Sequence, residues 1–336
     1  MKTCLIVTSI SPPNLVLKAL AEGAADHSTD FILIGDSKSP QDFALDGVDY
    51  YPLERQRGLE FSFAKAAKER SYARKNIGYL IAMSRGAQAI IETDDDNFPR
   101  LEFWADRKRE VTGSTVESKG WVNVYGHFSS APIWPRGYPL QALHEPLAPR
   151  GVSQTRTCPI QQSLADANPD VDAVYRMVMP LPLDFNIAEP VILGQHSWCP
   201  FNSQNTTTFP EAYLLLYLPT FCSFRMTDIW RSFVAQRLLW TCGWQLSFSS
   251  ATVWQERNAH DLLKDFADEI PGYLHNAEII KELDSLVLKN GESNLAENLR
   301  TCYLKLIDMK LVDQQEMELL DLWIADHASI YGGTKA

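Results

Sequence analysis

Short apolar runs alternate with amphipathic stretches over the first hundred residues of the chain. Residues 4–10, 31–34 and 89–91 are continuous apolar or β-branched runs, which are typical of buried strands. Residues 14–24 and 60–85 place apolar positions at helical spacing. This alternation predicts an α/β fold in which a mostly parallel sheet has helices on both faces.

The pattern changes after about residue 120. Residues 120–220 carry many prolines and aromatic residues and few helical signals, which predicts irregular β structure and long loops. Residues 226–240 read as a helix that begins near Thr227 or Asp228. Past about residue 260 the chain is helical, and one helix face there is formed by Leu295, Leu299, Cys302, Tyr303 and Leu306. We therefore expect a helical C-terminal appendage over residues 261–336.

Composition narrows the class of protein. The chain has 336 residues, of which 45% are hydrophobic and 22% charged, a balance that is ordinary for a globular protein. Its formal net charge of -11 argues against nucleic-acid binding, which needs a basic face. No apolar run approaches the roughly 18 to 20 residues of a membrane span. The 6 cysteines are scattered, which favours reduced thiols and a cytoplasmic location.

Three adjacent aspartates, Asp94, Asp95 and Asp96, directly follow the predicted strand at 89–91. Their carboxylates repel one another, and a divalent cation would remove that repulsion. Mg²⁺ and Mn²⁺ prefer carboxylate oxygens and also bind phosphates. The run therefore predicts a metal-bound diphosphate, and a solvated acidic turn is the structural alternative.

A basic segment precedes the aspartates. Between Glu54 and Arg85 eight lysines and arginines face three acids, which produces a local field that attracts anions. A diphosphate is the natural ligand of such a field beside a carboxylate-bound metal. We assign Arg74 and Asn76 to this site, whereas Lys65 and Lys68 fit a solvated helix face.

These elements together resemble the nucleotide-sugar-binding half of GT-A glycosyltransferases. The resemblance rests on ARKNIGY at 73–79, an A-x-x-x-G-A string at 82–87 and IIETDDD at 90–96. It implies that Asp94 and Asp96 are the ends of a DxD motif, that Asp95 lies at the nucleotide, and that Asp96 is the direct metal ligand. It also implies nucleoside contacts from Asp36 and from the loop that contains Thr8 and Ser9.

A closer resemblance extends to about residue 260. The strings WPRG (134–137), PDVDAVYR (169–176), FNSQNT (201–206) and QRLLW (236–240) are similar to motifs of the STELLO-type glycosyltransferase-like family. Plant members of that family carry a membrane anchor and act in the Golgi with cellulose synthesis. The pieces PDVDA and TDIW also resemble reversibly glycosylated polypeptides, which act as UDP-arabinose mutases.

The resemblance suggests two further assignments. Asp228 matches the position at the start of a helix where GT-A enzymes often place the base that removes a proton from the acceptor hydroxyl; a plain helix cap is the alternative. A late histidine often completes the metal site, and His260 is the first candidate and His196 the second.

Three motifs supply groups for the donor sugar or the acceptor. Trp134 and Arg136 are suited to stacking on a sugar and holding a phosphate. Asp172 and Arg176 are suited to sugar binding, or to an ordinary i,i+4 ion pair if that stretch is helical. Asn202 and Gln204 are compact hydrogen-bonding groups suited to hydroxyl recognition, with turn formation as the alternative.

The sequence thus predicts a GT-A-like, Rossmann-type mixed sheet flanked by helices, over residues 1–260. Residues 1–110 form its nucleotide-sugar-binding half and residues 111–260 its acceptor and catalytic half. The expected function is that of a Mn²⁺- or Mg²⁺-dependent hexosyl- or pentosyltransferase, which moves a sugar from a nucleotide-diphosphate sugar to a glycan or glycolipid. The alternatives are a sugar-nucleotide mutase that uses Arg136 or Arg176, and a non-catalytic partner in a polysaccharide-synthesis complex.

Overall fold

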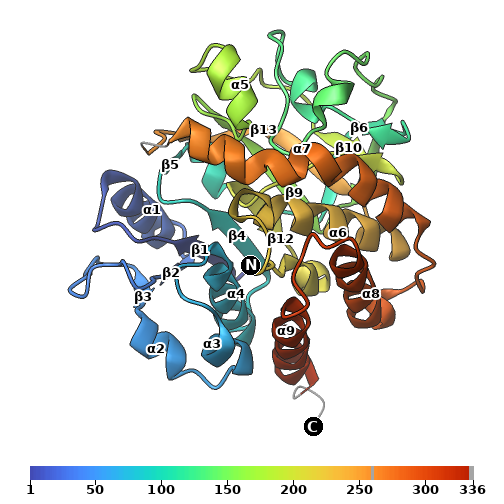
Figure 1. Cartoon of the computed structure of the whole chain (residues 1–336). Helices are drawn as coiled ribbons and strands as arrows, with labels where there is room; N and C mark the ends of the chain where they lie inside the picture. Colours follow the sequence, from blue (N-terminus) through green and yellow to red (C-terminus); the bar gives the residue numbers. More distant parts are fainter. Residues whose placement is uncertain (259–260, 333–336) are drawn as a thin grey trace.

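The computed structural model describes residues 1–258 and 261–332 and contains one large mixed sheet with helices packed around it (Figure 1). The strands of this sheet are β1 (Thr3–Thr8), β2 (Asp30–Ile34), β3 (Asp49–Tyr51), β4 (Ala89–Thr93), β5 (Asn97–Pro99), β6 (Glu110–Val116), β8 (Ser153–Thr157), β9 (Ile160–Asp166), β10 (Val191–Leu193), β12 (Asn205–Thr208) and β13 (Leu246–Gln255). A separate pair joins β7 (Gly120–Trp121) to β11 (Ser197–Trp198).

The order of strands is β3-β2-β1-β4-β12-β9-β13-β10-β6-β8, and β5 pairs with β13 off this path. Strands β3, β2, β1 and β4 are parallel, and β12 is antiparallel to both of its neighbours, β4 and β9. The predicted α/β fold with a mixed, Rossmann-type sheet is therefore confirmed.

The helices cover both faces of this sheet. They are α1 (Leu15–Asp26), α2 (Leu53–Arg57), α3 (Ser62–Ala66), α4 (Lys75–Ser84), α5 (Ala173–Val178), α6 (Thr227–Thr241), α7 (Leu262–Ser285), α8 (Leu295–Asp308) and α9 (Glu316–Gly332). Short 3-10 turns include η1 (Tyr72–Arg74), η2 (Leu101–Trp104), η3 (Val124–His127), η4 (Leu140–Ala142), η5 (Pro210–Leu216), η6 (Phe224–Met226) and η7 (Glu292–Asn294). Among the described residues, no helix is both long and apolar enough to cross a bilayer.

Strand β1 shows why its sequence is apolar without alternation. Cys4 and Ile6 belong to the core under α4, whereas Leu5 and Val7 belong to the core under α1. Because both faces of the strand are covered, its four central positions are apolar. Helix α4 packs close to the sheet at Gly78, where an added Cβ would lie 2.6 Å from Ile6 Cγ2.

The single helix expected over residues 60–85 is wrong. The structure has α3 and α4 there, joined by an irregular segment and η1. The side chain of Arg74 donates hydrogen bonds to the carbonyls of Ala67 and Lys68, and Asp36 Oδ2 accepts one from the Ser71 amide at 3.1 Å. These tertiary contacts hold the backbone between α3 and α4 in a non-helical path.

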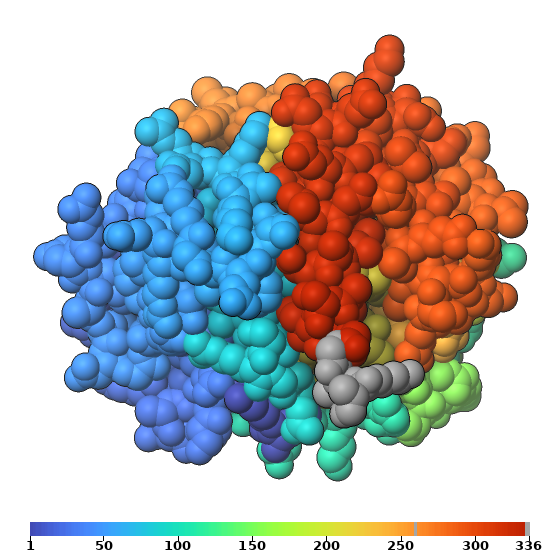
Figure 2. Space-filling view, turned by 90° about the horizontal axis from the view of Figure 1, so that it is seen from below, coloured from blue at the N-terminus to red at the C-terminus, as the bar shows by residue number. Residues whose placement is uncertain are grey.

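The C-terminal helices α7, α8 and α9 pack against the rest of the protein. Helix α7 contacts α5 and α6, α8 contacts α6, and α9 contacts α3 and α4. Figure 2 shows α9, in red, between the N-terminal part in blue and the other C-terminal helices in orange. The expected helical character of this region is confirmed; the domain boundary at residue 260 stays a prediction.

Candidate functional site

A cavity of about 480 Å³ opens beyond the carboxyl ends of β1, β2 and β4, the edge at which open α/β sheets bind ligands. One side of the cavity comes from the N-terminal half and contains Thr8, Ser9, Asp36, Lys38, Arg70, Ser71, Tyr72, Arg74, Asp94, Asp95 and Asp96. The other side contains Arg136, Asp170, Arg176, Ser203, Gln204, Phe224, Arg225, Asp228, Gln255, Arg257 and Asn258. The two halves that the sequence predicts separately therefore face one space.

The three aspartates form the turn between β4 and β5, and their side chains diverge. Asp94 Oδ1 accepts hydrogen bonds from the Tyr72 hydroxyl at 2.9 Å and from Lys75 Nζ at 3.2 Å. Asp95 Oδ2 accepts one from Ser9 Oγ at 2.5 Å, and its carbonyl accepts one from Asn14 Nδ2. Asp96 Oδ1 accepts one from Gln255 Nε2 at 3.0 Å. The turn is thus connected to β1, α4 and β13.

Burial makes negative charge on this turn costly. It raises the pKa of Asp96 to about 7, with the charge of Asp94 as the next cause. Burial also raises the pKa of Asp94, although Lys75 partly offsets this shift. A cation in the cavity would stabilise the ionised carboxylates.

The oxygen donors in this turn fit a hard divalent cation. In the part of the chain that the structure describes, Asp94 Oδ2 and Asp95 Oδ1 have no hydrogen-bond partner. Mg²⁺ and Mn²⁺ are commonly held by one or two carboxylates together with substrate phosphates. Within the described residues, no group of three or more histidine, cysteine or acidic side chains is placed to hold a metal ion by itself. A cation here would therefore depend on ligands from the substrate.

The two histidine candidates have different outcomes. His260 lies outside the described residues. The structure places His196 away from the cavity, with its Nδ1 2.5 Å from Asp284 Oδ1 on an exposed surface, so this second candidate is wrong.

Of the two residues of the basic segment that were assigned to the site, Arg74 lies at the cavity and Asn76 does not. Arg74 lines the cavity, but its guanidinium is bound to Gln56 and to two backbone carbonyls. Asn76 is fully buried, exchanges hydrogen bonds with the backbone of Leu218 and does not line the cavity, so its assignment to the site is wrong. Lys38 and Arg70 line the cavity and have no ion pair with any described residue.

The loops after β1 and β2 are joined at the predicted nucleoside end. Ser39 Oγ accepts from the Asp36 amide and donates to the Ser9 carbonyl. Asp36 Oδ1 accepts from the Ser37 amide. Thr8, Ser9 and Asp36 all line the cavity, and their roles toward a nucleoside stay predictions.

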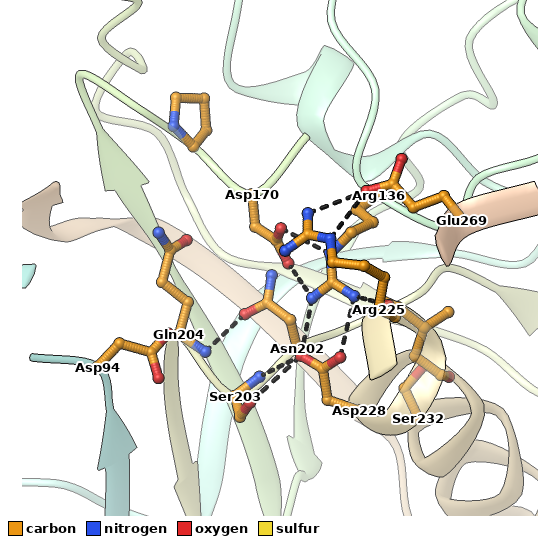
Figure 3. Close-up of polar contacts among 12 residues, drawn as sticks. Asp94, Arg136, Asp170, Asn202, Ser203, Gln204, Arg225, Asp228, Ser232 and Glu269 are labelled. Atoms are coloured by element: carbon orange, nitrogen blue, oxygen red, sulfur yellow. Dashed lines mark hydrogen bonds and ion pairs between the residues drawn. The ribbon is translucent and has the colours of Figure 1, made fainter. Parts of the chain in front are cut away.

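Arg136 organises the opposite wall (Figure 3). Its Nε and Nη2 donate to the two oxygens of Asp170, both at 2.8 Å. Its Nη1 and Nη2 donate to the two oxygens of Asp228, at 3.0 and 2.9 Å. Asp228 Oδ2 also accepts from the amide and hydroxyl of Ser203, both at 3.2 Å. Every oxygen of these two carboxylates therefore has a donor.

Asp228 is held as a carboxylate at the first turn of α6. Burial alone would raise the pKa of Asp228, but the charge of Arg136 and the hydrogen bonds from Arg136 hold it well below its usual range. The structure thus favours a role for Asp228 in positioning Arg136. Its predicted role as proton acceptor is untested, since hydrogen bonds in a substrate-free site can rearrange on binding.

The other predicted substrate-binding residues divide into two sets. Arg176 and Gln204 line the cavity. Trp134, Asp172 and Asn202 are buried and do not line it, so the structure does not bring them to the site. Asp172 accepts hydrogen bonds from Trp134 Nε1 and from the Tyr175 amide, which caps α5. Asn202 Oδ1 accepts from Gln162 and from the Gln204 amide.

The alternative expectation was an ordinary i,i+4 ion pair between Asp172 and Arg176. This ion pair is not found among the described residues either. Arg176 Nη2 donates to the Pro169 carbonyl at 2.7 Å instead. This hydrogen bond to the loop before α5 orients the Arg176 side chain, which lines the cavity.

Several residues that line the cavity or lie beneath the aspartate turn were not assigned from the sequence. Tyr72 and Lys75 lie within the basic segment that the sequence had singled out, and this segment was the available signal. The structure places their polar groups beside Asp94. Ser203 lies in the motif FNSQNT at 201–206, from which Asn202 and Gln204 were assigned to hydroxyl recognition. Gln255 and Asn258 carry no sequence signal, because β13 brings them to Asp96 over a long chain separation.

Comparisons with known proteins agree with this architecture. The family model described as STELLO glycosyltransferases matches residues 225–332. A protein of Arabidopsis thaliana named "Probable glycosyltransferase STELLO2" is 26% identical over 320 residues, which cover 88% of this chain and 41% of that protein. The Arabidopsis thaliana protein named "Probable glycosyltransferase STELLO1" is 30% identical over 235 residues, which cover 63% of this chain and 30% of that protein.

The chain therefore spans less than half the length of each of these relatives. The matched C-terminal segment includes α6, which carries Asp228 into the cavity, and the helices packed around it. By these comparisons the chain is similar to STELLO glycosyltransferases, with the family model matching its C-terminal part and one relative aligning over most of its length.

Proposed function

We propose that the protein is a metal-dependent glycosyltransferase that takes a hexosyl or pentosyl group from a nucleotide-diphosphate sugar. The observation that carries this proposal is the single cavity shared by the aspartate turn and the Arg136 array. A donor that spans such a space places its diphosphate at one wall and its sugar at the other. The names of the relatives support the same reaction class.

The donor wall has the groups that a nucleotide diphosphate requires. Asp94, Asp95 and Asp96 would hold Mn²⁺ or Mg²⁺, which when bound neutralises the charge that develops on the leaving diphosphate. Lys38 and Arg70 line the same wall and are exposed, so their cationic heads are available to phosphate oxygens. Thr8, Ser9 and Asp36 lie where the nucleoside would extend.

The opposite wall fits a sugar and its acceptor. Arg136, Asp170 and Asp228 present rigid, charged hydrogen-bonding groups, and Ser203, Gln204 and Arg176 lie beside them. Sugar hydroxyls are recognised by such fixed polar groups in an enclosed site. We infer that a glycan or glycolipid hydroxyl enters on this side.

Calorimetric titration with UDP-glucose and GDP-mannose, each with Mn²⁺ and with EDTA, tests the proposal. We expect one of these donors to bind only with the metal. Asp96→Asn should weaken that binding about tenfold or more, because it removes a carboxylate from the metal site. Asp106→Asn is the matched control, since Asp106 is exposed and lies outside the cavity. Failure of nucleotides and nucleotide sugars to bind with Mn²⁺ would overturn the proposal.

A second candidate function is that of a nucleotide-sugar-binding partner without transfer activity. It is favoured by the ion pairs of Asp170 and Asp228, because Arg136 contacts both oxygens of each carboxylate and holds the pKa of Asp228 well below its usual range, which makes Asp228 a weak base. Product analysis separates the two functions: released nucleotide with a glycosylated or hydrolysed product supports transfer. Tight donor binding with no product supports the binding partner.

A further inference from the structure

Lys75 is the first residue of α4 and its ammonium group lies beneath the aspartate turn. The side chain is fully buried. Its Nζ lies 2.7 Å from the Tyr72 hydroxyl, 3.0 Å from the Thr93 carbonyl, 3.2 Å from Asp94 Oδ1 and 3.4 Å from the Ser203 carbonyl. The ammonium therefore lies in a cage of oxygens, as a bound cation would.

This cage holds the ammonium in place. Two of its oxygens are backbone carbonyls, one at the end of β4 and the other shortly before β12, so the cage is part of the sheet. A buried lysine that left these partners would lose hydrogen bonds without gaining water. Lys75 is thus a fixed positive charge and cannot swing away when a metal arrives.

The two carboxylate oxygens of Asp94 have different surroundings in this arrangement. Its Oδ1 is occupied by Lys75 and Tyr72, whereas its Oδ2 has no partner among the described residues. A divalent cation bound at Oδ2 would gain only part of the carboxylate charge and would be repelled by the ammonium nearby. Both effects weaken metal binding by the protein alone.

We propose that Lys75 sets the metal affinity of the site, so that the divalent cation binds tightly only together with the diphosphate of the donor. The phosphate oxygens supply additional metal ligands, and their negative charge compensates for the positive charge of Lys75. The second half of this inference, the coupling to diphosphate, rests on the proposed function. The first half concerns the metal alone and does not.

Electron paramagnetic resonance of free Mn²⁺ measures metal binding without nucleotide. We expect the wild-type protein to bind Mn²⁺ weakly and Lys75→Met to bind it about tenfold or more tightly, because the repelling charge is gone and Asp94 Oδ1 is released. Lys18→Met, which removes an exposed lysine on α1, should leave the affinity unchanged. A gain of affinity in a folded variant separates the proposed role from a structural one, because loss of a merely structural contact would not strengthen metal binding at the intact turn.

Addition of UDP tests the coupling. In the wild-type protein UDP should raise the affinity for Mn²⁺ about tenfold or more, and in Lys75→Met the increase should be smaller. Unchanged or weaker Mn²⁺ binding by Lys75→Met in the absence of UDP would overturn the inference. Loss of UDP binding in the wild-type protein with Mn²⁺ would instead count against the proposed function and leave the metal-only result standing.

Circular dichroism checks that Lys75→Met is folded. If it is not, Lys75→Gln carries the test, because it also removes the positive charge but keeps a hydrogen-bonding group near the Thr93 carbonyl. Lys75→Gln should then bind Mn²⁺ about tenfold or more tightly than the wild-type protein. No change in that variant would overturn the inference.

Discussion

At the scale of single residues, Arg136 organises the wall of the cavity that lies opposite the aspartate turn. One guanidinium forms ion pairs with Asp170 and Asp228 at once in a buried place. Removal of one member of such an array leaves a buried charge with fewer partners. The array therefore links the stability of the protein to the geometry of this wall of the cavity.

Asp228→Asn separates positioning from proton transfer. We expect it to lower the free energy of unfolding by about 1–3 kcal/mol, because charged hydrogen bonds to Arg136 are lost. Turnover should fall as well, since the wall loses its geometry; turnover left intact would show that Asp228 is not the base. Urea unfolding and nucleotide release measure the two effects.

Asp170→Asn is the matched control, because Asp170 holds the other side of Arg136. If Asp228→Asn kept full stability and lost about a hundredfold or more in turnover while Asp170→Asn did not, Asp228 would be identified as the base. Similar losses in both variants would support the positioning role.

At the scale of elements, a residue of α9 caps the distant helix α3. Helix α3 has only five residues and no cap from its own preceding residue. Asp326 of α9 supplies that cap, with its two oxygens accepting from the amides of Ser62 at 3.1 Å and Phe63 at 2.8 Å. Helix α3 precedes the irregular segment that leads to Arg70 and Tyr72 at the cavity.

Asp326→Ala should therefore lower the free energy of unfolding by about 1–2 kcal/mol, the usual cost of a lost N-cap. Hydrogen exchange should show faster opening of residues 62–66. Asp308→Ala, at the end of α8, removes a carboxylate without such a role and is the control. Equal exchange rates in the two variants would contradict the capping role of Asp326.

At the scale of the whole molecule, the C-terminal helices are part of the main core. Trp323 of α9 is fully buried, packs on Phe63 and Tyr217 and donates to the Leu214 carbonyl. Glu316 accepts hydrogen bonds from the Thr220 and Phe221 amides and from the Tyr217 hydroxyl. Helix α9 therefore contacts both halves of the predicted GT-A-like region.

A chain that ends at residue 314 tests this integration. We expect it to lose at least about 3–5 kcal/mol of stability, because the site of a large buried aromatic residue is emptied. Its thermal unfolding by circular dichroism should shift strongly or lose cooperativity. A chain that ends at residue 332 is the control, and wild-type unfolding of the shorter chain would show α9 to be an independent appendage.

The sequence by itself determined the elements whose signals are local. Apolar runs at β1, β2 and β4, the helix α6 and the buried face of α8 follow from short-range periodicity, because one residue pattern suffices to bury one face. The aspartate run was also visible, since three adjacent carboxylates after a strand stand out in any fold.

Only the tertiary structure decided which polar residues meet at the cavity. Asn76 and Arg74 have similar sequence signals, yet Asn76 binds Leu218 and Arg74 lines the cavity. Lys75 of α4, Gln255 of β13 and Ser9 after β1 reach the aspartate turn from separate parts of the chain. Their positions depend on the order of strands in the sheet, which long-range pairing sets and local periodicity does not contain.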